Sequence, residues 1–165
     1  MELKYFDWAK HQAVMRPNKV AIKDYYSGEE LTYLELEKRA LKIATYFQRK
    51  KIGINDRVAL LSRNNSVFFE LQFACAKKGV ILVPLNWRLT APELSFILKD
   101  CDPKLLVFDS PFKGAVSSLN NSSTNMKLLE FDSSNFNNEF SSVWESLDDE
   151  VEEIDASLED LITIM

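Results

Sequence analysis

The segment VPLNWRLTAPEL, residues 83–94, places a tryptophan and an arginine directly after an apolar run. An arginine guanidinium is planar, stays charged, and presents its donors in a fork that matches phosphate oxygens. Arg88 is therefore a candidate for binding a phosphate group. The competing interpretation is structural: Trp87 packs over the end of a buried strand, and Arg88 hydrogen-bonds the carbonyl groups of neighbouring loops.

Other chemically active side chains are few. The chain has a single histidine, His11, and two cysteines, Cys75 and Cys101, which cannot complete an ordinary zinc site without carboxylates. Neither G-x-G-x-x-G nor G-x-x-x-x-G-K-[ST] occurs, which excludes two common phosphate-binding loops. We expect no catalytic residue and no metal site in this chain. Two free thiols are typical of a reducing cytosol and predict a cytoplasmic protein.

Size and charge narrow the function classes. With 165 residues, 46% of them hydrophobic, the chain is long enough for one domain with a sizeable core. The first 127 residues carry 20 basic and 13 acidic side chains, a net charge of +7, and the last 38 carry 12 acidic and no basic ones. The basic residues are dispersed, so we expect solvated helix faces and no nucleic-acid partner. No apolar run reaches 18 residues, so no membrane span is expected. The N-terminus MELKYFDWAK carries charges among its apolar residues, so no signal peptide is expected either.

The N-terminal part of the chain predicts a helix, a hairpin and a long helix. Residues 5–15 have helical character up to Pro17, and the alternating run 19–26 and the run 31–33 flank a Ser-Gly turn. Thr32 and Glu35 form a capping box for the long helix. Its apolar stripe is expected to be Leu36, Ala40, Ile43, Ala44 and Phe47, with Glu35, Lys38, Arg39 and Lys42 on the opposite, solvated side.

Three apolar runs, 57–62, 80–85 and 104–109, alternate with helical segments. The first of these helical segments ends at Gly79, and the second begins with the capping box of Thr90 and Glu93. This β–α–β–α–β order predicts an α/β fold with a mostly parallel sheet flanked by helices, in which strand 57–62 is central. Ligands in such sheets bind at the carboxyl ends of the strands, where residues 62–66, 86–90 and 109–111 are expected to meet.

The remainder is less regular. A helix fragment and a strand at 127–132 are expected after residue 110, followed by a polar, acidic stretch and the apolar run LITIM at the end. The predicted organisation is an α/β core at 1–110, a variable acidic segment at 111–157 and a final strand at 158–165. An uncovered apolar strand favours self-association.

The residues from 31 to 109 resemble the N-terminal part of the AMP-forming acyl-CoA synthetases, the adenylate-forming superfamily. The similar segments are LTYLELEKRALKIATYF, GINDRVALLSRNN and FFELQFACAKKGVILVPLNWRLTAPELSFILKDCDPKLLVFD, preceded by RPNKVAI. Asn55 stands where a glycine is more usual. The form NWRL, with Trp87 and Arg88, is similar to fatty-acid-activating members.

The resemblance implies an enzyme that activates a carboxylic acid with ATP and Mg²⁺ to an acyl-adenylate and then transfers the acyl group to coenzyme A. It implies that the phosphate loop, the ribose-binding aspartate, the magnesium-binding acid and the C-terminal lysine all lie beyond Met165. This 165-residue fragment alone is then expected to be inactive, and Arg88 is the one candidate ligand residue, for a CoA phosphate. The alternative function is a non-catalytic binding or regulatory module of the same fold that pairs with another polypeptide.

Overall fold

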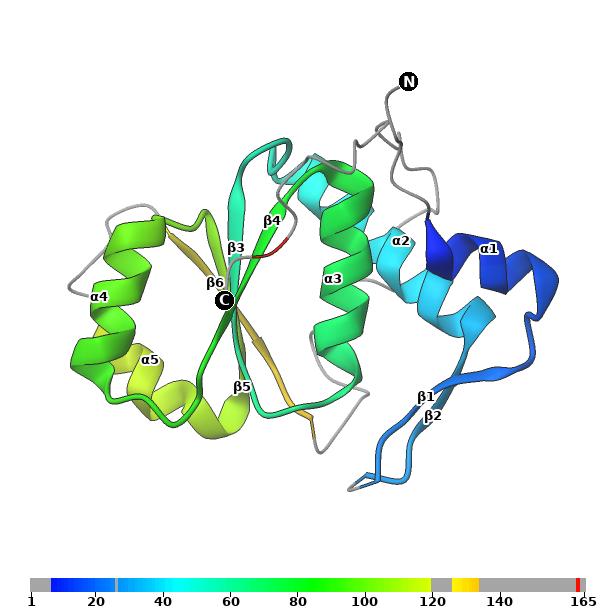
Figure 1. Cartoon of the computed structure of the whole chain (residues 1–165). Helices are drawn as coiled ribbons and strands as arrows, with labels where there is room; N and C mark the ends of the chain where they lie inside the picture. Colours follow the sequence, from blue (N-terminus) through cyan, green and yellow to red (C-terminus); the bar gives the residue numbers. More distant parts are fainter. Residues whose placement is uncertain (1–6, 26, 120–125, 134–162, 164–165) are drawn as a thin grey trace.

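A twisted sheet of four parallel strands forms the centre of the protein (Figure 1). The computed structural model describes residues 7–25, 27–119, 126–133 and 163. The strand order is β4–β3–β5–β6, so β3 is interior, as the sequence predicts. The bounds are β3 Arg57–Leu61, β4 Ile81–Leu85, β5 Leu105–Asp109 and β6 Lys127–Phe131.

Helices cover both faces of this sheet. The long helix α2 (Tyr33–Arg49) and α3 (Ser66–Lys78) lie on one side, and α4 (Ala91–Cys101) and α5 (Lys113–Leu119) on the other, with a short 3₁₀ turn at Ser110–Phe112 before α5 (Figure 1). Helix α1 (Trp8–Met15) packs against α2 at the edge of the molecule. Next to α1 lies the predicted antiparallel hairpin, β1 (Val20–Lys23) and β2 (Glu30–Thr32).

Strands β3, β4 and β5 are buried on both faces, which explains why their sequences are nearly continuously apolar rather than alternating. Successive residues of each strand enter two different cores. One core joins the sheet to α2 and α3 and includes Phe47, Val58, Leu60, Leu71, Leu82, Leu105 and Val107. The other joins it to α4 and α5 and includes Ala59, Leu61, Val83, Leu94, Leu98, Leu106 and Phe108.

The helix starts and stops follow the local signals in the sequence. At α2, the backbone N–H of Thr32 donates to Glu35 Oε2 at 2.8 Å, and the N–H of Glu35 donates back to Thr32 Oγ1 at 3.3 Å. The five predicted stripe residues of α2 are all buried. Gly79 ends α3 with φ of 61°, a left-handed conformation that suits glycine.

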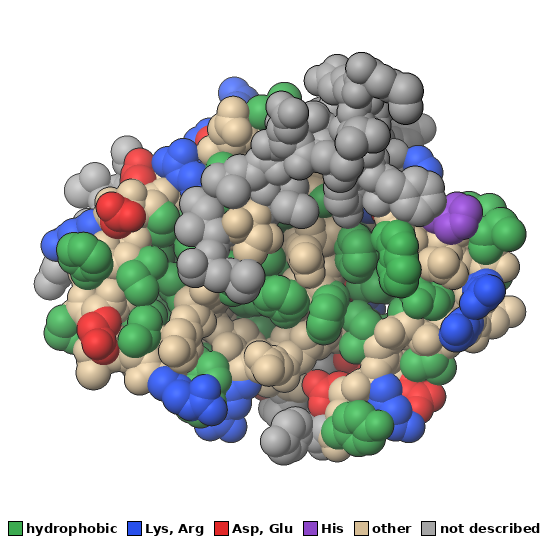
Figure 2. All heavy atoms as spheres, viewed as in Figure 1, with side chains coloured by type: hydrophobic (Ala, Val, Ile, Leu, Met, Phe, Trp, Pro, Cys, Tyr) green, Lys and Arg blue, Asp and Glu red, His purple; other side chains and the backbone are tan. Residues whose placement is uncertain are grey.

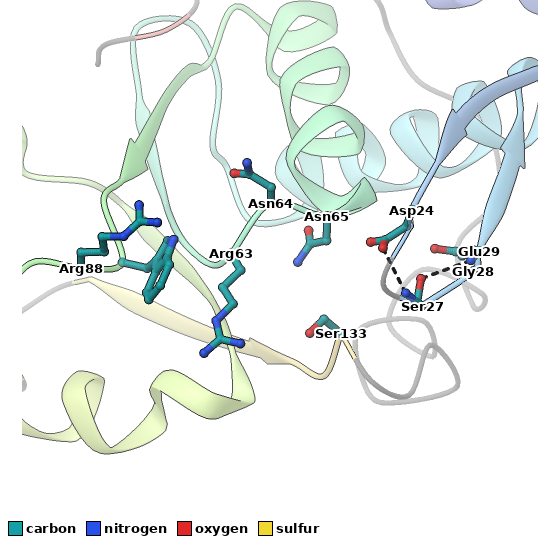
Figure 3. A pocket seen from close by; sticks show the side chains of 10 residues that line it. Asp24, Ser27, Gly28, Glu29, Arg63, Asn64, Asn65, Arg88 and Ser133 are labelled. Carbon is teal, nitrogen blue, oxygen red and sulfur yellow. Dashed lines mark hydrogen bonds between the residues drawn. The ribbon is translucent and has the colours of Figure 1, made fainter.

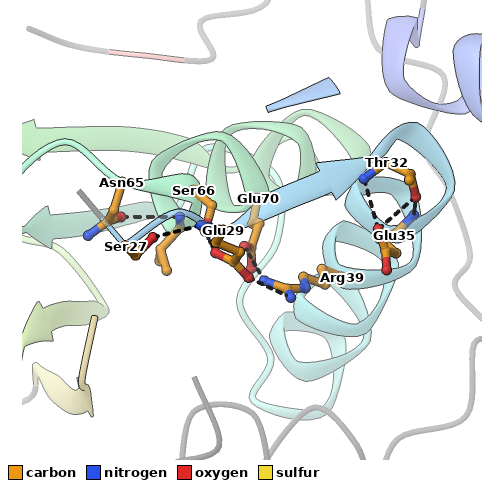
Figure 4. A network of polar contacts seen from close by, with 9 residues as sticks. Ser27, Glu29, Thr32, Glu35, Arg39, Asn65, Ser66 and Glu70 are labelled. Carbon is orange, nitrogen blue, oxygen red and sulfur yellow. Dashed lines mark hydrogen bonds and ion pairs between the residues drawn. The ribbon is translucent and has the colours of Figure 1, made fainter. Parts of the chain in front are cut away.

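The expectation that Arg39 belongs to a solvated face is wrong. Its guanidinium donates to Glu29 Oε1 at 2.9 Å and to Glu70 Oε1 at 3.1 Å, which ties α2 to the hairpin and to α3 (Figure 4). The side chain of Glu70 is only 3% exposed. Ser66, one turn earlier, is the first residue of the same helix. The sequence pattern failed here because it reads one helix at a time, whereas Arg39 meets a carboxylate on a neighbouring helix.

A second buried ion pair fastens α1. Lys77 of α3, whose side chain is 1% exposed, donates to Glu37 of α2 at 2.8 Å and also to Asp7, the N-cap residue of α1. A lysine without such partners would be costly to bury. Three helices are therefore held together at one ammonium group.

Most of the predicted acidic segment lies outside the described residues, and so does most of the predicted final strand. Of the latter, Thr163 is described, and it forms an isolated parallel bridge with Leu82 of β4. Among the described helices, none is long and apolar enough to cross a membrane. On the face shown in Figure 2, Lys and Arg side chains are dispersed rather than gathered in one basic patch.

Candidate functional site

A cleft of about 980 Å³ opens at the carboxyl ends of β3 and β4. One wall comes from the loops after these strands, as expected for a parallel sheet. Figure 3 shows the opposite wall, the tip of the β1–β2 hairpin. The lining residues are Asp24, Ser27, Gly28, Glu29, Arg63, Asn64, Asn65, Trp87, Arg88 and Ser133.

Trp87 is the centre of the basic wall. The guanidinium carbon of Arg88 lies 4.4 Å from the centroid of its ring, and that of Arg63 lies 5.1 Å away, both in the range of cation–π contacts. Trp87 also packs against Phe112, with centroids 6.4 Å apart, and borders the core under α4. The prediction that Trp87 packs over the strand end is confirmed, but Arg88 stacks on the indole instead of hydrogen-bonding loop carbonyls.

Short turns fix the loops that carry these arginines. After β4, the side-chain oxygen of Asn86 accepts the N–H of Arg88 at 3.0 Å, and its carbonyl accepts the N–H of Leu89 at 3.1 Å. After β3, Asn65 caps α3 by accepting the N–H of Val67 at 3.1 Å and donates to Ser62 at 2.7 Å. Each turn leaves its arginine exposed at the rim of the cleft.

The hairpin wall was not anticipated as part of the site. Its tip is a tight turn in which the N–H of Gly28 donates to the carbonyl of Asp24 at 2.9 Å, with Gly28 at φ of 75°. The N–H of Ser27 donates to the Asp24 carboxylate at 3.1 Å (Figure 3). The Ser27-Gly28 pair marked a turn in the sequence, but no local signal indicated that this turn faces the strand ends.

The Arg39 network (Arg39, Glu29, Glu70 and Ser66) holds that wall in place. Glu29 lies at the hairpin tip, accepts from Arg39, and also accepts from the Ser66 hydroxyl at 3.3 Å at the start of α3 (Figure 4). Burial raises the pKa of Glu70, and the neighbouring Arg39 guanidinium opposes that shift. The polar groups of this network therefore pair with one another.

Residues 109–111, the third segment expected at the carboxyl edge of the sheet, contribute to the cleft indirectly. Asp109, buried at the end of β5, accepts the backbone N–H of Ser133 at 3.0 Å and its hydroxyl at 2.6 Å. Ser133 lies in the cleft, whereas Asp109 does not line it. The role of Asp109 is to hold the loop after β6 against the site.

The cysteines and the histidine lie elsewhere. Cys75 belongs to the core on the α3 side of the sheet and Cys101 borders the core on the α4 side, while His11 is exposed on α1. Burial raises the pKa of both thiols, which disfavours the thiolate. The described part of the chain also contains no group of three or more His, Cys, Asp or Glu that could hold a metal ion. The two exposed arginines of the cleft can bind anions, but its described residues offer no nucleophile–base pair.

Comparison with known proteins agrees with this fold. A family model described as AMP-binding enzyme matches residues 9–165. The chain is 40% identical over 92 residues to the fatty acid–[acyl-carrier-protein] ligase ScoC of Streptomyces coeruleorubidus, covering 56% of this chain and 18% of that protein. It is 34% identical over 112 residues to the feruloyl-CoA synthase of an Amycolatopsis species, covering 68% and 22%.

The same fold occurs in the inhibitor-bound crystal structure of the N-terminal domain of FACL13 from Mycobacterium tuberculosis. The TM-score is 0.86 at 26% identity, over 99% of this chain and 41% of that one. The chain spans about a fifth of the length of the curated relatives it matches. On the strength of the family match over residues 9–165, this chain belongs to the AMP-binding enzyme family.

Proposed function

We propose that this chain is the N-terminal part of an AMP-forming acid–CoA ligase. The complete enzyme joins a carboxylic acid to the α-phosphate of ATP with release of pyrophosphate, and then passes the acyl group to the thiol of coenzyme A with release of AMP. The observation that carries this proposal is the cleft at the carboxyl ends of β3 and β4, with two exposed arginines on its wall. The family match supports the same reaction class.

Arg88 is the proposed ligand of a CoA phosphate. Its guanidinium lies against Trp87, and none of the described residues forms an ion pair with it. A guanidinium without a carboxylate partner keeps its donors available for phosphate oxygens. The chain's own contribution to catalysis is then binding and orientation of the acceptor, because the described residues include no group of three or more His, Cys, Asp or Glu that could hold Mg²⁺.

The proposed acid is a fatty acid. The motif NWRL at Trp87 and Arg88 favours this class, and so does the similarity to ScoC, a fatty acid ligase. Because the chain is also similar to a feruloyl-CoA synthase, aromatic acids are the class of substrate to compare with fatty acids. We also propose a cytoplasmic location and, for the chain by itself, lack of ligase activity and self-association through residues 158–165.

The first experiment measures the size of the native protein in its source cell with an antibody against this chain. The protein of that size is then purified and supplied with ATP, Mg²⁺, CoA and either fatty acids of increasing length or ferulate, and acyl-CoA and AMP are quantified. Equal amounts of AMP and a fatty acyl-CoA support the proposal. A native protein of 19 kDa that forms neither product contradicts it.

The 165-residue chain, assayed in parallel, is expected to form no acyl-CoA. Size-exclusion chromatography with light scattering checks its self-association, and a clean monomer at high concentration contradicts that expectation.

A further inference from the structure

Arg63 is the second cation of the cleft wall, and its surroundings differ from those of the structural arginines. Arg39 binds two carboxylates, and Arg57 donates from Nε to the carbonyl of Cys101 at 2.7 Å. Arg63 is exposed, and its guanidinium stacks on the Trp87 ring. Among the described residues no carboxylate forms an ion pair with it. Its hydrogen-bond donors are therefore available to a ligand.

Trp87 holds both cleft arginines against one ring. Stacking limits the rotamers of two long side chains, so that less conformational entropy is lost when a ligand binds them. The two like charges also repel each other, and anionic groups on a ligand would relieve this repulsion. In Figure 3, Arg63 lies between Arg88 and Ser133, further into the cleft than Arg88.

The charges of the two walls differ in sign. Across the cleft the hairpin presents the carboxylate of Asp24, next to which a phosphate would be disfavoured, whereas the Glu29 carboxylate is paired with Arg39. Anionic groups of a ligand therefore belong on the side of Arg63 and Arg88. The volume of about 980 Å³ is at the upper end for small-molecule pockets and suits an extended ligand.

We propose that Arg63 and Arg88 bind two separate phosphate groups of one ligand, a nucleotide with a phosphate monoester in addition to its 5′-phosphates. This inference rests on the proposed function and refines it, because coenzyme A carries both a ribose 3′-phosphate and a diphosphate. A thiol presented on a carrier protein brings a single phosphodiester and no nucleotide. Arg63 is therefore a specificity-determining residue that favours a free CoA acceptor over a carrier-protein acceptor.

The test is calorimetric titration of the 165-residue chain with adenosine 3′,5′-bisphosphate and with AMP, at fixed ionic strength because exposed charges are screened by salt. The wild-type chain is expected to bind the bisphosphate about tenfold more tightly than AMP, since one more charge-assisted contact forms. Arg63→Gln and Arg88→Gln each weaken bisphosphate binding by about tenfold. The residue that holds the 3′-phosphate is identified by loss of the preference over AMP.

Arg49→Gln is the matched control, because Arg49 is an exposed arginine at the end of α2 and does not line the cleft. It is expected to bind the bisphosphate like the wild type. Wild-type affinity in Arg63→Gln overturns the inference, and so does absence of bisphosphate binding by the wild-type chain at millimolar concentration. Circular dichroism of every variant verifies that the fold is retained.

Failure of this inference can be distinguished from failure of the proposed function. If the native enzyme makes acyl-CoA and its KM for CoA is unchanged by Arg63→Gln, the function stands and the role of Arg63 is refuted. If bisphosphate binding depends on both arginines but no acid is ligated, the nucleotide site stands and the ligase assignment is refuted.

Discussion

The two walls of the cleft use arginine in opposite ways. Behind the hairpin wall, Arg39 is surrounded by protein carboxylates, and one of them, on Glu70, has a side chain only 3% exposed. On the facing wall, Arg63 and Arg88 lie on an aromatic ring and, among the described residues, have no carboxylate partner. The same side chain thus stabilises the fold where the chain neutralises its charge, and remains available to a ligand where it does not.

The difference follows from desolvation. Burying a carboxylate such as Glu70 costs several kcal/mol unless a cation and hydrogen bonds compensate it, so Arg39 is required wherever Glu70 is ionised. Exposed guanidinium groups remain hydrated and need no such compensation. A ring contact of about 0.5–1 kcal/mol is enough to orient them. Stability should therefore depend on Arg39 and binding on Arg63 and Arg88.

Arg39→Gln should have the largest effect on stability. It removes the cation from Glu70 and Glu29, and breaking a buried pair costs about 3–5 kcal/mol. Because the Arg39 side chain is itself 35% exposed, we expect the lower end, about 3 kcal/mol. Urea denaturation at pH 7 measures the loss. Arg49→Gln, with the same charge change, should alter the free energy of unfolding by less than about 0.5 kcal/mol, and an equal loss in both variants would refute the special role of Arg39.

Glu70→Gln tests the same network through pH. Burial, opposed by Arg39, holds the pKa of Glu70 above that of an ordinary carboxyl, so the folded state binds this proton more tightly than the unfolded chain. The stability that this group contributes is fully present below the ordinary pKa of about 4.3 and is lost as pH rises through the raised pKa.

The free energy of unfolding of the wild type, relative to Glu70→Gln, should therefore decrease as the pH rises from acid to neutral. Urea midpoints of the two proteins at a series of pH values measure this. A difference that stays constant or increases with pH would show that Glu70 does not titrate as its burial implies.

Gly28→Ala disturbs the hairpin wall without changing any charge. Apart from its two chain neighbours, no described residue has an atom within 4 Å of the position of an added Cβ, so the expected loss of about 1 kcal/mol comes from the φ of 75° alone. Gly114→Ala is the control, because Gly114 also has open space around it but lies in helix α5 at an ordinary φ. There alanine should be neutral or stabilising. Thermal unfolding of the two variants compares them, and similar shifts in Tm would mean that backbone strain at the hairpin tip is unimportant.

The sequence predicted the parts of this structure that depend on neighbours along the chain. Thr32 and Glu35 are three residues apart and were recognisable as a capping box, and the apolar runs identified the buried parallel strands. The order of those strands also located the edge of the sheet where Arg88 lies. Arg39 and Glu70 are 31 residues apart and meet only because α2 packs on α3.

The contact between Arg63 and Trp87 was missed for the same reason. Arg63 directly follows the strand 57–62, a position that could have marked it, but its contact with Trp87 depends on the parallel register of β3 and β4. The hairpin wall depends on how the hairpin sits beside α3, which no periodicity encodes. Local chemistry could be read from the sequence, whereas partnerships between distant residues required the fold.

The smallest effects on stability are expected at the basic wall itself. Arg63→Gln and Arg88→Gln each remove one cation–π contact at an exposed position, worth about 0.5–1 kcal/mol, and relieve some repulsion between the two arginines. Each should therefore change the free energy of unfolding in urea by less than about 1 kcal/mol.

The double variant Arg63→Gln/Arg88→Gln shows how the lost ring contacts and the relieved repulsion balance. If the repulsion matters, the double variant is less stable than the sum of the single changes predicts, because each single change already relieves the same repulsion. A loss near that of Arg39→Gln at either position would make these arginines structural, and the contrast between the two walls would no longer hold.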